Sequence, residues 1–219
     1  GELLDAATDA MFRGRTAYSD GRGEKGLRIA LAERYTRSTG RDITSDQVLC
    51  FPGTQPALFT VLMGVAEKGC EVLVGDPMYA TYQGVIRATG ADIVPVPLRP
   101  EHGFRIHAAD IAARITPRTT AILLTTPHNP TGSIRADTDL AAIGQLAIAH
   151  DLWIISDEVY EELVFEGSTC SSPLARPELA ERVIVVASIS TAHAAPGCRS
   201  GWCIGPEVFT ETLLPLSET

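Results

Sequence analysis

The segment Thr120–Gly132 reads TAILLTTPHNPTG: an apolar run leads into a loop that two prolines stiffen and a glycine ends. A short, continuously apolar run is typical of a strand that is buried on both faces of a parallel sheet. Similar runs recur at residues 47–51, 71–76, 92–98, 152–157, 182–188 and 201–205. Because helix-like segments separate most of these runs, the sequence predicts an α/β fold, a three-layer α/β/α sandwich around a mostly parallel sheet.

The predicted helices carry apolar residues at helical spacing and end at glycine or polar residues. Gly26–Gly40, GLRIALAERYTRSTG, is the clearest of them, and the opening GELLDAATDAMF also has helical character. The long segment ADTDLAAIGQLAIAHD has Asp137 or Thr138 as its expected N-terminal cap. Further helices are predicted at residues 53–69, 79–90 and 106–115.

The composition favours an ordinary globular protein. Of the 219 residues, 45% are hydrophobic and 21% are charged, which suits one domain of this fold class. The formal net charge of −9 argues against a nucleic-acid partner, since phosphate binding requires a basic surface. No apolar run approaches the ~20 residues that span a bilayer, so no membrane partner is expected, and the opening segment lacks the pattern of a signal peptide.

The cysteines, histidines and lysines limit which disulfides, metal sites and reactive amines the sequence can supply. The five cysteines form no CxxC pair and their number is odd, so we expect free thiols and a cytoplasmic location. The five histidines match no metal-ligand spacing, and no metal ion is expected. Sixteen arginines stand against two lysines, Lys25 and Lys68, so no lysine is available after residue 68.

Polar residues follow the predicted strands one after another, and the carboxyl ends of parallel strands meet at one edge of a sheet. After the first strand, Gly53, Thr54 and Gln55 begin a helix, where free backbone N–H groups and the positive helix end bind anions such as phosphate. Ordinary helix capping explains the same three residues. The chain has neither GxGxxG nor GxxxxGK[ST], which counts against a dinucleotide fold and a P-loop.

Two later loops contain residue types that local structure alone explains poorly. Asn129, the only asparagine of the chain, lies in TTPHNPTG, where a turn accounts for the prolines and the glycine but not for the amide. Asp157 ends the next strand, and Tyr160 follows three residues later. Because a buried carboxylate is costly unless it is paired, a cationic ring nitrogen is a fitting partner for Asp157; the alternative role is a cap for the following turn.

Together these segments resemble the class I and II aminotransferases, fold-type I enzymes that use pyridoxal 5′-phosphate (PLP). The matching segments come in the family's order and at its spacing: AYSDGRGEKGLRIALAERY, PGTQPAL, DPMYATY, TPHNPTG, SDEVYEELVF and SISTAHAAPGCRSGW. The resemblance implies that residues 1–219 are the large, PLP-binding domain, and that the family's N-terminal arm and C-terminal small domain are missing from this sequence.

The resemblance also implies a phosphate cradle. Its members are Gly53, Thr54, Gln55, Ser188, Ser190 and Arg199. Of these, Ser188 and Arg199 are the expected direct phosphate ligands, with the Arg199 guanidinium bidentate. Tyr18 matches a tyrosine that reaches the phosphate of the neighbouring subunit, so the resemblance implies a homodimer with shared sites.

The positions around the cofactor ring follow from the same resemblance. Tyr79 matches the aromatic residue that stacks on the pyridine, and Asn129 and Tyr160 match the donors to the phenolic oxygen. Asp157 matches the partner of the protonated ring nitrogen, which keeps the ring able to accept electrons. The implied catalytic positions are Asp157, Tyr160 and Thr191.

Thr191 stands where the family has a lysine. The family motif is Ser-x-Ser-Lys-x-(His or aromatic)-x-x-x-Gly-x-Arg, and Ser188, Gly197 and Arg199 keep its register here. That lysine forms a Schiff base with the cofactor and then carries a proton to and from the substrate's α-carbon, and a threonine hydroxyl does neither. We therefore expect an aminotransferase by family whose own activity is absent or strongly impaired.

Other groups replace the lysine poorly. Lys25 precedes a helix near the N-terminus, Lys68 ends a helix away from the ligand edge, and His193 lies two positions late. The threonine has three explanations: an introduced substitution, an error in the sequence, or a natural homologue that binds the cofactor without transamination. The leading hypothesis is amino transfer between an amino acid and a 2-oxo acid. A non-catalytic PLP- or effector-binding homologue and a PLP-dependent lyase are the alternatives.

Overall fold

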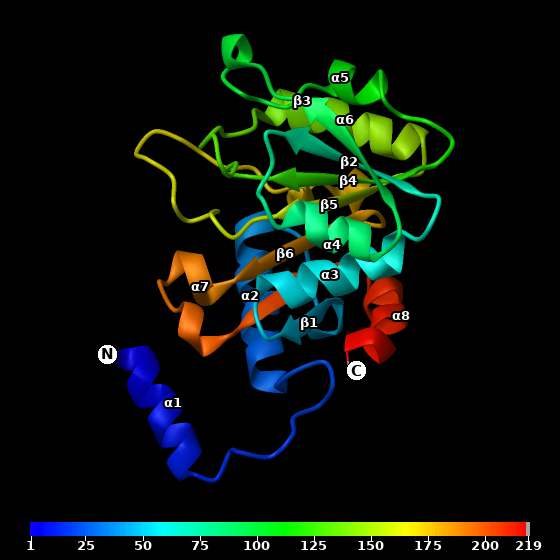
Figure 1. Ribbon diagram of the computed structural model, residues 1–219. Coiled ribbons are helices and arrows are strands. Elements are labelled where there is room, and N and C mark those ends of the chain that lie inside the picture. Colours follow the sequence, from blue (N-terminus) through cyan, green and yellow to red (C-terminus); the bar gives the residue numbers. More distant parts are fainter. Residues whose placement is uncertain (218–219) are drawn as a thin grey trace.

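The computed structural model describes residues 1–217, in which a seven-stranded mixed sheet lies between two layers of helices (Figure 1). The strands are β1 Val48–Phe51, β2 Glu71–Asp76, β3 Asp92–Pro97, β4 Thr119–Thr125, β5 Trp153–Asp157, β6 Val183–Ser188 and β7 Gly201–Ile204. The α-helices are α1 Glu2–Phe12, α2 Lys25–Thr39, α3 Thr54–Val65, α4 Tyr82–Ala88, α5 Ala108–Ala112, α6 Asp137–Ala149, α7 Ile189–Ala192 and α8 Glu207–Ser217. Short 3₁₀ helices lie at Ser45–Gln47, Pro100–His102, Pro173–Ala175, Pro177–Leu179 and Pro196–Cys198.

The order of the strands brings distant loops to one edge of the sheet. The order is β1-β7-β6-β5-β4-β2-β3, and the pairs from β6 to β3 are parallel. β7 is antiparallel to both β6 and β1, so β1 runs in the same direction as β6. The carboxyl end of β1 therefore lies at the same edge as those of β2, β4, β5 and β6, and the beginning of β7 lies there too.

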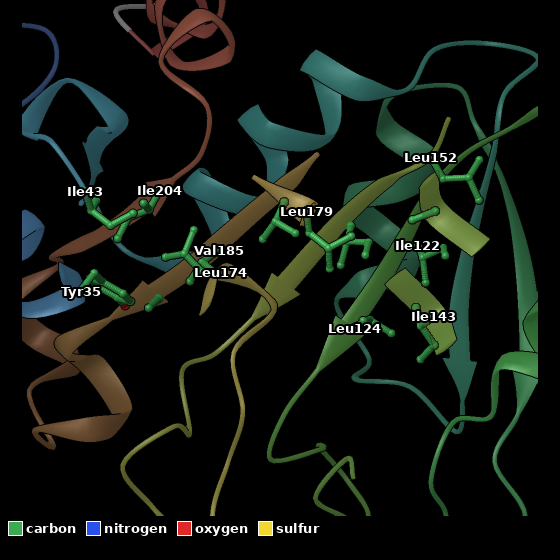
Figure 2. Close-up of a cluster of buried hydrophobic side chains, with 14 of the residues drawn as sticks. Tyr35, Ile43, Ile122, Leu124, Ile143, Leu152, Leu174, Leu179, Val185 and Ile204 are labelled. Atoms are coloured by element: carbon green, nitrogen blue, oxygen red, sulfur yellow. The ribbon is translucent and has the colours of Figure 1, made fainter. Parts of the chain in front are cut away.

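Both faces of the sheet are covered, as the continuously apolar strands predicted. Residues of α2, α5 and α6 pack in one core cluster, and residues of α3, α4 and α8 pack in the other. Successive residues of β4 alternate between them: Ile122 and Leu124 lie in the first cluster, and Ala121 and Leu123 in the second. Figure 2 shows side chains of the first cluster along the sheet. This arrangement confirms the three-layer α/β/α sandwich.

The starts of α6 and of the chain differ in how well the sequence predicted them. The expected cap of α6 is wrong: its N-cap is Ala136 without a side-chain hydrogen bond, and Asp137 is already the first helical residue. The helical character of the opening segment is confirmed by α1, which stands apart from the body of the molecule (Figure 1) and buries none of its residues. Within residues 1–217, the structure contains no helix that is long and apolar enough to cross a membrane.

Candidate functional site

A cavity of about 170 Å³ lies at the sheet edge where the polar loops meet. Most residues that the sequence singled out line it: Thr54, Gln55, Tyr79, Asn129, Asp157, Tyr160, Ser190, Thr191 and Arg199. Tyr82, Thr125 and Val159 complete the lining. The strand order thus gathers side chains that follow β1, β2, β4, β5 and β6 and one that precedes β7.

Asp157 is a desolvated carboxylate in the wall of this cavity. Only 4% of the residue is exposed, and burial raises the pKa of its carboxyl to about 6, against the lowering effect of two hydrogen bonds. The Tyr82 hydroxyl donates to Oδ2 at 2.6 Å, and the Val159 backbone N–H donates to Oδ1 at 3.3 Å. The second bond is the turn cap that sequence analysis gave as the alternative role. Since no described residue forms an ion pair with Asp157, a cationic ligand group is a fitting partner for it.

Tyr82 is a site residue that the sequence analysis missed. Its side chain is buried, its hydroxyl also shares a 2.7 Å hydrogen bond with Thr125 Oγ1, and burial raises its pKa well above the ordinary range. The ring of Tyr79 meets it edge-on, with centroids 5.6 Å apart. The available signal was the three-residue spacing of the tyrosines in DPMYATY, which brings two side chains to one side of a helical turn.

Asn129 and Tyr160 contact each other across neighbouring strand ends. The Asn129 Nδ2 donates to the Tyr160 hydroxyl at 3.1 Å. The resemblance assigned these two side chains to a single oxygen atom of the cofactor, and their contact places an amide and a hydroxyl at one point of the cavity wall. Asn129 follows β4 and Tyr160 follows β5, so the pairing depends on the parallel register of those strands.

The opposite end of the cavity suits an anion. Thr54 and Gln55 begin α3, and Gly53 precedes them with φ of 109°. The Arg199 guanidinium lies against this helix start, donating to Pro52 O at 3.0 Å. A Cβ atom on Gly53 would lie 2.2 Å from Arg199 Nη2, so a larger residue at this position would displace the guanidinium. A helix N-terminus and an arginine together favour a phosphate-sized anion.

The two serines have different positions. Ser190 lines the cavity, and its Oγ is buried without a hydrogen-bond partner in the described chain. Ser188 is buried as the N-cap of α7: its Oγ accepts from the Ser190 backbone N–H at 3.3 Å, and it does not line the cavity. The resemblance implied that Ser188 is a direct phosphate ligand, but of the two serines only Ser190 lines the cavity and has a hydroxyl without a partner in the described chain.

Thr191 lies in α7, half-buried on the cavity wall, where the resemblance placed the lysine. Lys25 begins α2 and Lys68 follows α3, and neither lines the cavity. His193 is exposed and does not line the cavity either. Tyr18 is fully exposed and lies in a separate open groove that shares Arg199 with the cavity. Within residues 1–217, therefore, no amine lines the cavity.

Comparison with known proteins identifies the family. The profile described as aminotransferase class I and II matches residues 2–219. The chain belongs to this family. Class I and II aminotransferases are PLP-dependent enzymes, which confirms the recognised family and its cofactor.

Among similar relatives, the arginine–pyruvate transaminase of Pseudomonas aeruginosa is 45% identical over 93% of this chain and 52% of its own length. A probable N-succinyldiaminopimelate aminotransferase of Mycobacterium tuberculosis is 39% identical over 94% of the chain and 52% of its own length.

Solved aminotransferase structures have the same fold. The N-succinyldiaminopimelate aminotransferase from Mycobacterium tuberculosis has a TM-score of 0.94 at 35% identity, over 99% of this chain and 57% of that one. The aspartate aminotransferase from Thermus thermophilus with maleate has a TM-score of 0.93 at 33% identity, over 98% of this chain and 56% of that one. The chain thus spans about half the length of the aminotransferases that it matches.

Proposed function

We propose that residues 1–219 form the PLP-binding large domain of an aminotransferase that transfers an amino group between an amino acid and a 2-oxo acid. The observation that carries the proposal is the desolvated Asp157 carboxylate at one end of a cavity whose other end is an anion site. A ligand with a cationic ring nitrogen and a phosphate is complementary to both ends. Family membership supports the same ligand.

The anion site fits the phosphate of PLP. The backbone N–H groups at the start of α3 and the guanidinium of Arg199 supply the positive field. The Ser190 Oγ, buried without a partner in the described part of the chain, gains an acceptor there. Gly53 keeps the space for Arg199 open. Ser188 acts through the backbone of Ser190, which it holds at the first turn of α7.

The remaining side chains fit the ring. Asp157 would pair with the ring nitrogen, and the Tyr82 hydroxyl fixes the orientation of that carboxylate. Asn129 and Tyr160 would hold the phenolic oxygen, and Tyr79, one-third exposed, would cover one face of the ring. When bound, PLP withdraws electrons from the substrate's α-carbon. The catalytic contribution of Asp157 is to keep the ring nitrogen cationic.

Thr191 limits what this chain does with the cofactor. Its hydroxyl donates or accepts a hydrogen bond, but it forms no covalent bond to the cofactor's aldehyde carbon and is a very poor base near neutral pH. General base catalysis commonly contributes about 10²–10⁴-fold, so we propose that transamination by this chain is absent or strongly impaired. The same residue favours the second candidate, a homologue that binds PLP without catalysis. A PLP-dependent lyase is a third use of the same cavity.

The assembly and setting are proposals as well. A homodimer is supported by Tyr18, which is fully exposed beside the groove of Arg199, and by Leu4 and Phe12, which α1 presents to solvent. The five cysteines are free thiols, which supports a cytoplasmic location. The name of the Pseudomonas relative makes arginine and pyruvate the first substrate pair to test.

Titration with PLP followed by borohydride reduction tests the proposal. We expect a saturable change in the absorption of PLP and no cofactor-sized mass on the reduced chain. The Thr191→Lys variant should gain that mass, with the peptide 183–202 carrying it. Absence of binding in both chains would refute the cofactor assignment. An adduct on Lys25 or Lys68 in the unmodified chain would refute the assigned position. If a full-length enzyme that carries the lysine binds PLP covalently but transfers no amino group, that result would favour the lyase function.

A further inference from the structure

A second, smaller cavity of about 20 Å³ adjoins the end of β4. Thr125 lines both this cavity and the larger one. Its other walls come from the ends of β2 and β4 and from the loops that follow β3 and β4, which contribute Leu98, Phe104, Arg105, His128, Ser133 and Arg135. We call it the Arg135 cavity. Neither the family's cofactor nor the proposed reaction uses it.

Arg135 is a buried cation without a hydrogen-bond partner. Only 7% of the residue is exposed, and its Nε and Nη2 are buried with no acceptor in the described chain. Burial lowers the pKa of the guanidinium, but an arginine remains protonated at any physiological pH. A buried charge with unsatisfied donors is costly, so this position calls for an acceptor that residues 1–217 do not supply.

The neighbouring acids do not meet this need. Glu158 and Asp139 are close enough for their charge to act on Arg135, but neither forms an ion pair with it. The Glu158 Oε1 already accepts from the Ser156 and Ser172 hydroxyls, each at 2.8 Å, and burial raises its pKa to about 7. Asp139 lies 3.5 Å from Arg105 and from His107, and its Oδ2 accepts no hydrogen bond within the described chain, but no hydrogen bond or ion pair joins it to Arg135.

The lining adds charge of one sign. Arg105 and Arg135 both line the cavity, and no carboxylate does. His128 is held neutral, because burial lowers its pKa to about 4. Arg105 pairs with Asp139 at 3.5 Å, so the excess of positive charge in the cavity is that of Arg135. A negatively charged ligand is complementary to that excess.

Donor geometry and volume decide the kind of anion. Nε and Nη2 form one edge of the planar guanidinium, so their N–H groups point in parallel toward a single acceptor. A space of about 20 Å³ is enough for one water or one monatomic ion. We propose that the Arg135 cavity binds one chloride ion on the Nε and Nη2 edge of Arg135.

Thermal unfolding of the chain in sodium chloride and in sodium gluconate at equal ionic strength tests the inference, since gluconate is too large for the cavity. We expect a chloride-specific increase in Tm of about 2–4 °C once chloride exceeds its Kd about fivefold. Arg135→Met should abolish the increase. Arg87→Met, which removes an exposed arginine of α4 outside the cavity, should retain it.

Bromide replaces chloride in a second measurement on the unmodified chain, which stays decisive if Arg135→Met fails to fold. Crystals grown in sodium bromide should give an anomalous peak within hydrogen-bond distance of Arg135 Nε and Nη2. A site that contains water and no anomalous peak would overturn the inference. Equal Tm values in chloride and gluconate would overturn it as well. Both tests omit PLP, so their outcome is independent of the proposed function.

Discussion

Asp157→Asn should stabilise the PLP-free chain at alkaline pH and weaken its binding of PLP. Burial raises the pKa of Asp157 from 3.8 to about 6. The folded chain therefore holds this proton more tightly than the unfolded chain, and the stability that the protonated carboxyl contributes is present below the unfolded pKa and lost as pH rises through about 6. At about 1.4 kcal/mol for each pKa unit, the ionised carboxylate costs the fold about 3 kcal/mol at pH 8 and under about 1 kcal/mol at pH 4.

Asparagine keeps an oxygen acceptor for the Tyr82 hydroxyl and does not ionise. The difference in unfolding free energy between Asp157→Asn and the unmodified chain should thus rise by about 2–3 kcal/mol between pH 4 and pH 8. Urea unfolding followed by the fluorescence of Trp153 and Trp202 measures it. Asp42→Asn, at an exposed position, should show no such rise. The affinity for PLP should fall at least about tenfold with loss of a charged partner. A difference that is the same at both pH values would refute the reasoning, because it would mean that the carboxylate is not desolvated.

Three further substitutions test other parts of the site. Thr191→Lys should allow borohydride to fix PLP covalently on the chain, detected as a cofactor-sized mass; an unchanged mass would show that position 191 does not face the aldehyde. Tyr82→Phe removes both hydrogen bonds of a buried hydroxyl and should cost about 1–3 kcal/mol in urea unfolding, with weaker PLP binding in titration. Gly53→Ala places a Cβ 2.2 Å from Arg199 Nη2 at a φ of 109°, so PLP affinity should fall by more than about tenfold; unchanged affinity would remove Arg199 from the phosphate site.

Most of the strands were predictable because their environment is uniform. They lie between two apolar helix layers, so their residues form apolar runs whose position needs no knowledge of their partners, whereas the edge strand β3 is only partly buried. The antiparallel direction of β7 was not predictable in this way, because the short apolar run GWCI does not reveal whether the strand runs parallel or antiparallel to its neighbours. That direction matters for the site, because it brings Arg199, which precedes β7, to the edge where the other strands end.

Side chains at strand ends were predictable where the residue type conflicted with its surroundings. Asp157 and Asn129 are polar groups at the ends of buried strands, and that conflict marks them in the sequence. Tyr82 carries no such conflict, because a tyrosine in a helix that packs on a sheet is ordinary core. Its spacing from Tyr79 was the available signal, and its 2.6 Å bond to Asp157 shows its role. The choice between Ser188 and Ser190 depends on which residue caps α7, a difference of two positions that residue type does not reveal.

The described site contains two features that reduce the stability of the fold when no ligand is bound. Asp157 is a desolvated carboxylate, and the Ser190 Oγ has no partner in the described chain. A ligand that binds only the folded chain offsets such costs through its binding free energy. Thr191 differs from these residues, because a half-buried threonine at a helix costs little and needs no ligand. The costly features serve to bind and orient a ligand, whereas the missing lysine serves only covalent attachment and proton transfer. This difference between the two groups of residues is the basis of the proposal that the chain binds PLP and lacks the chemical step.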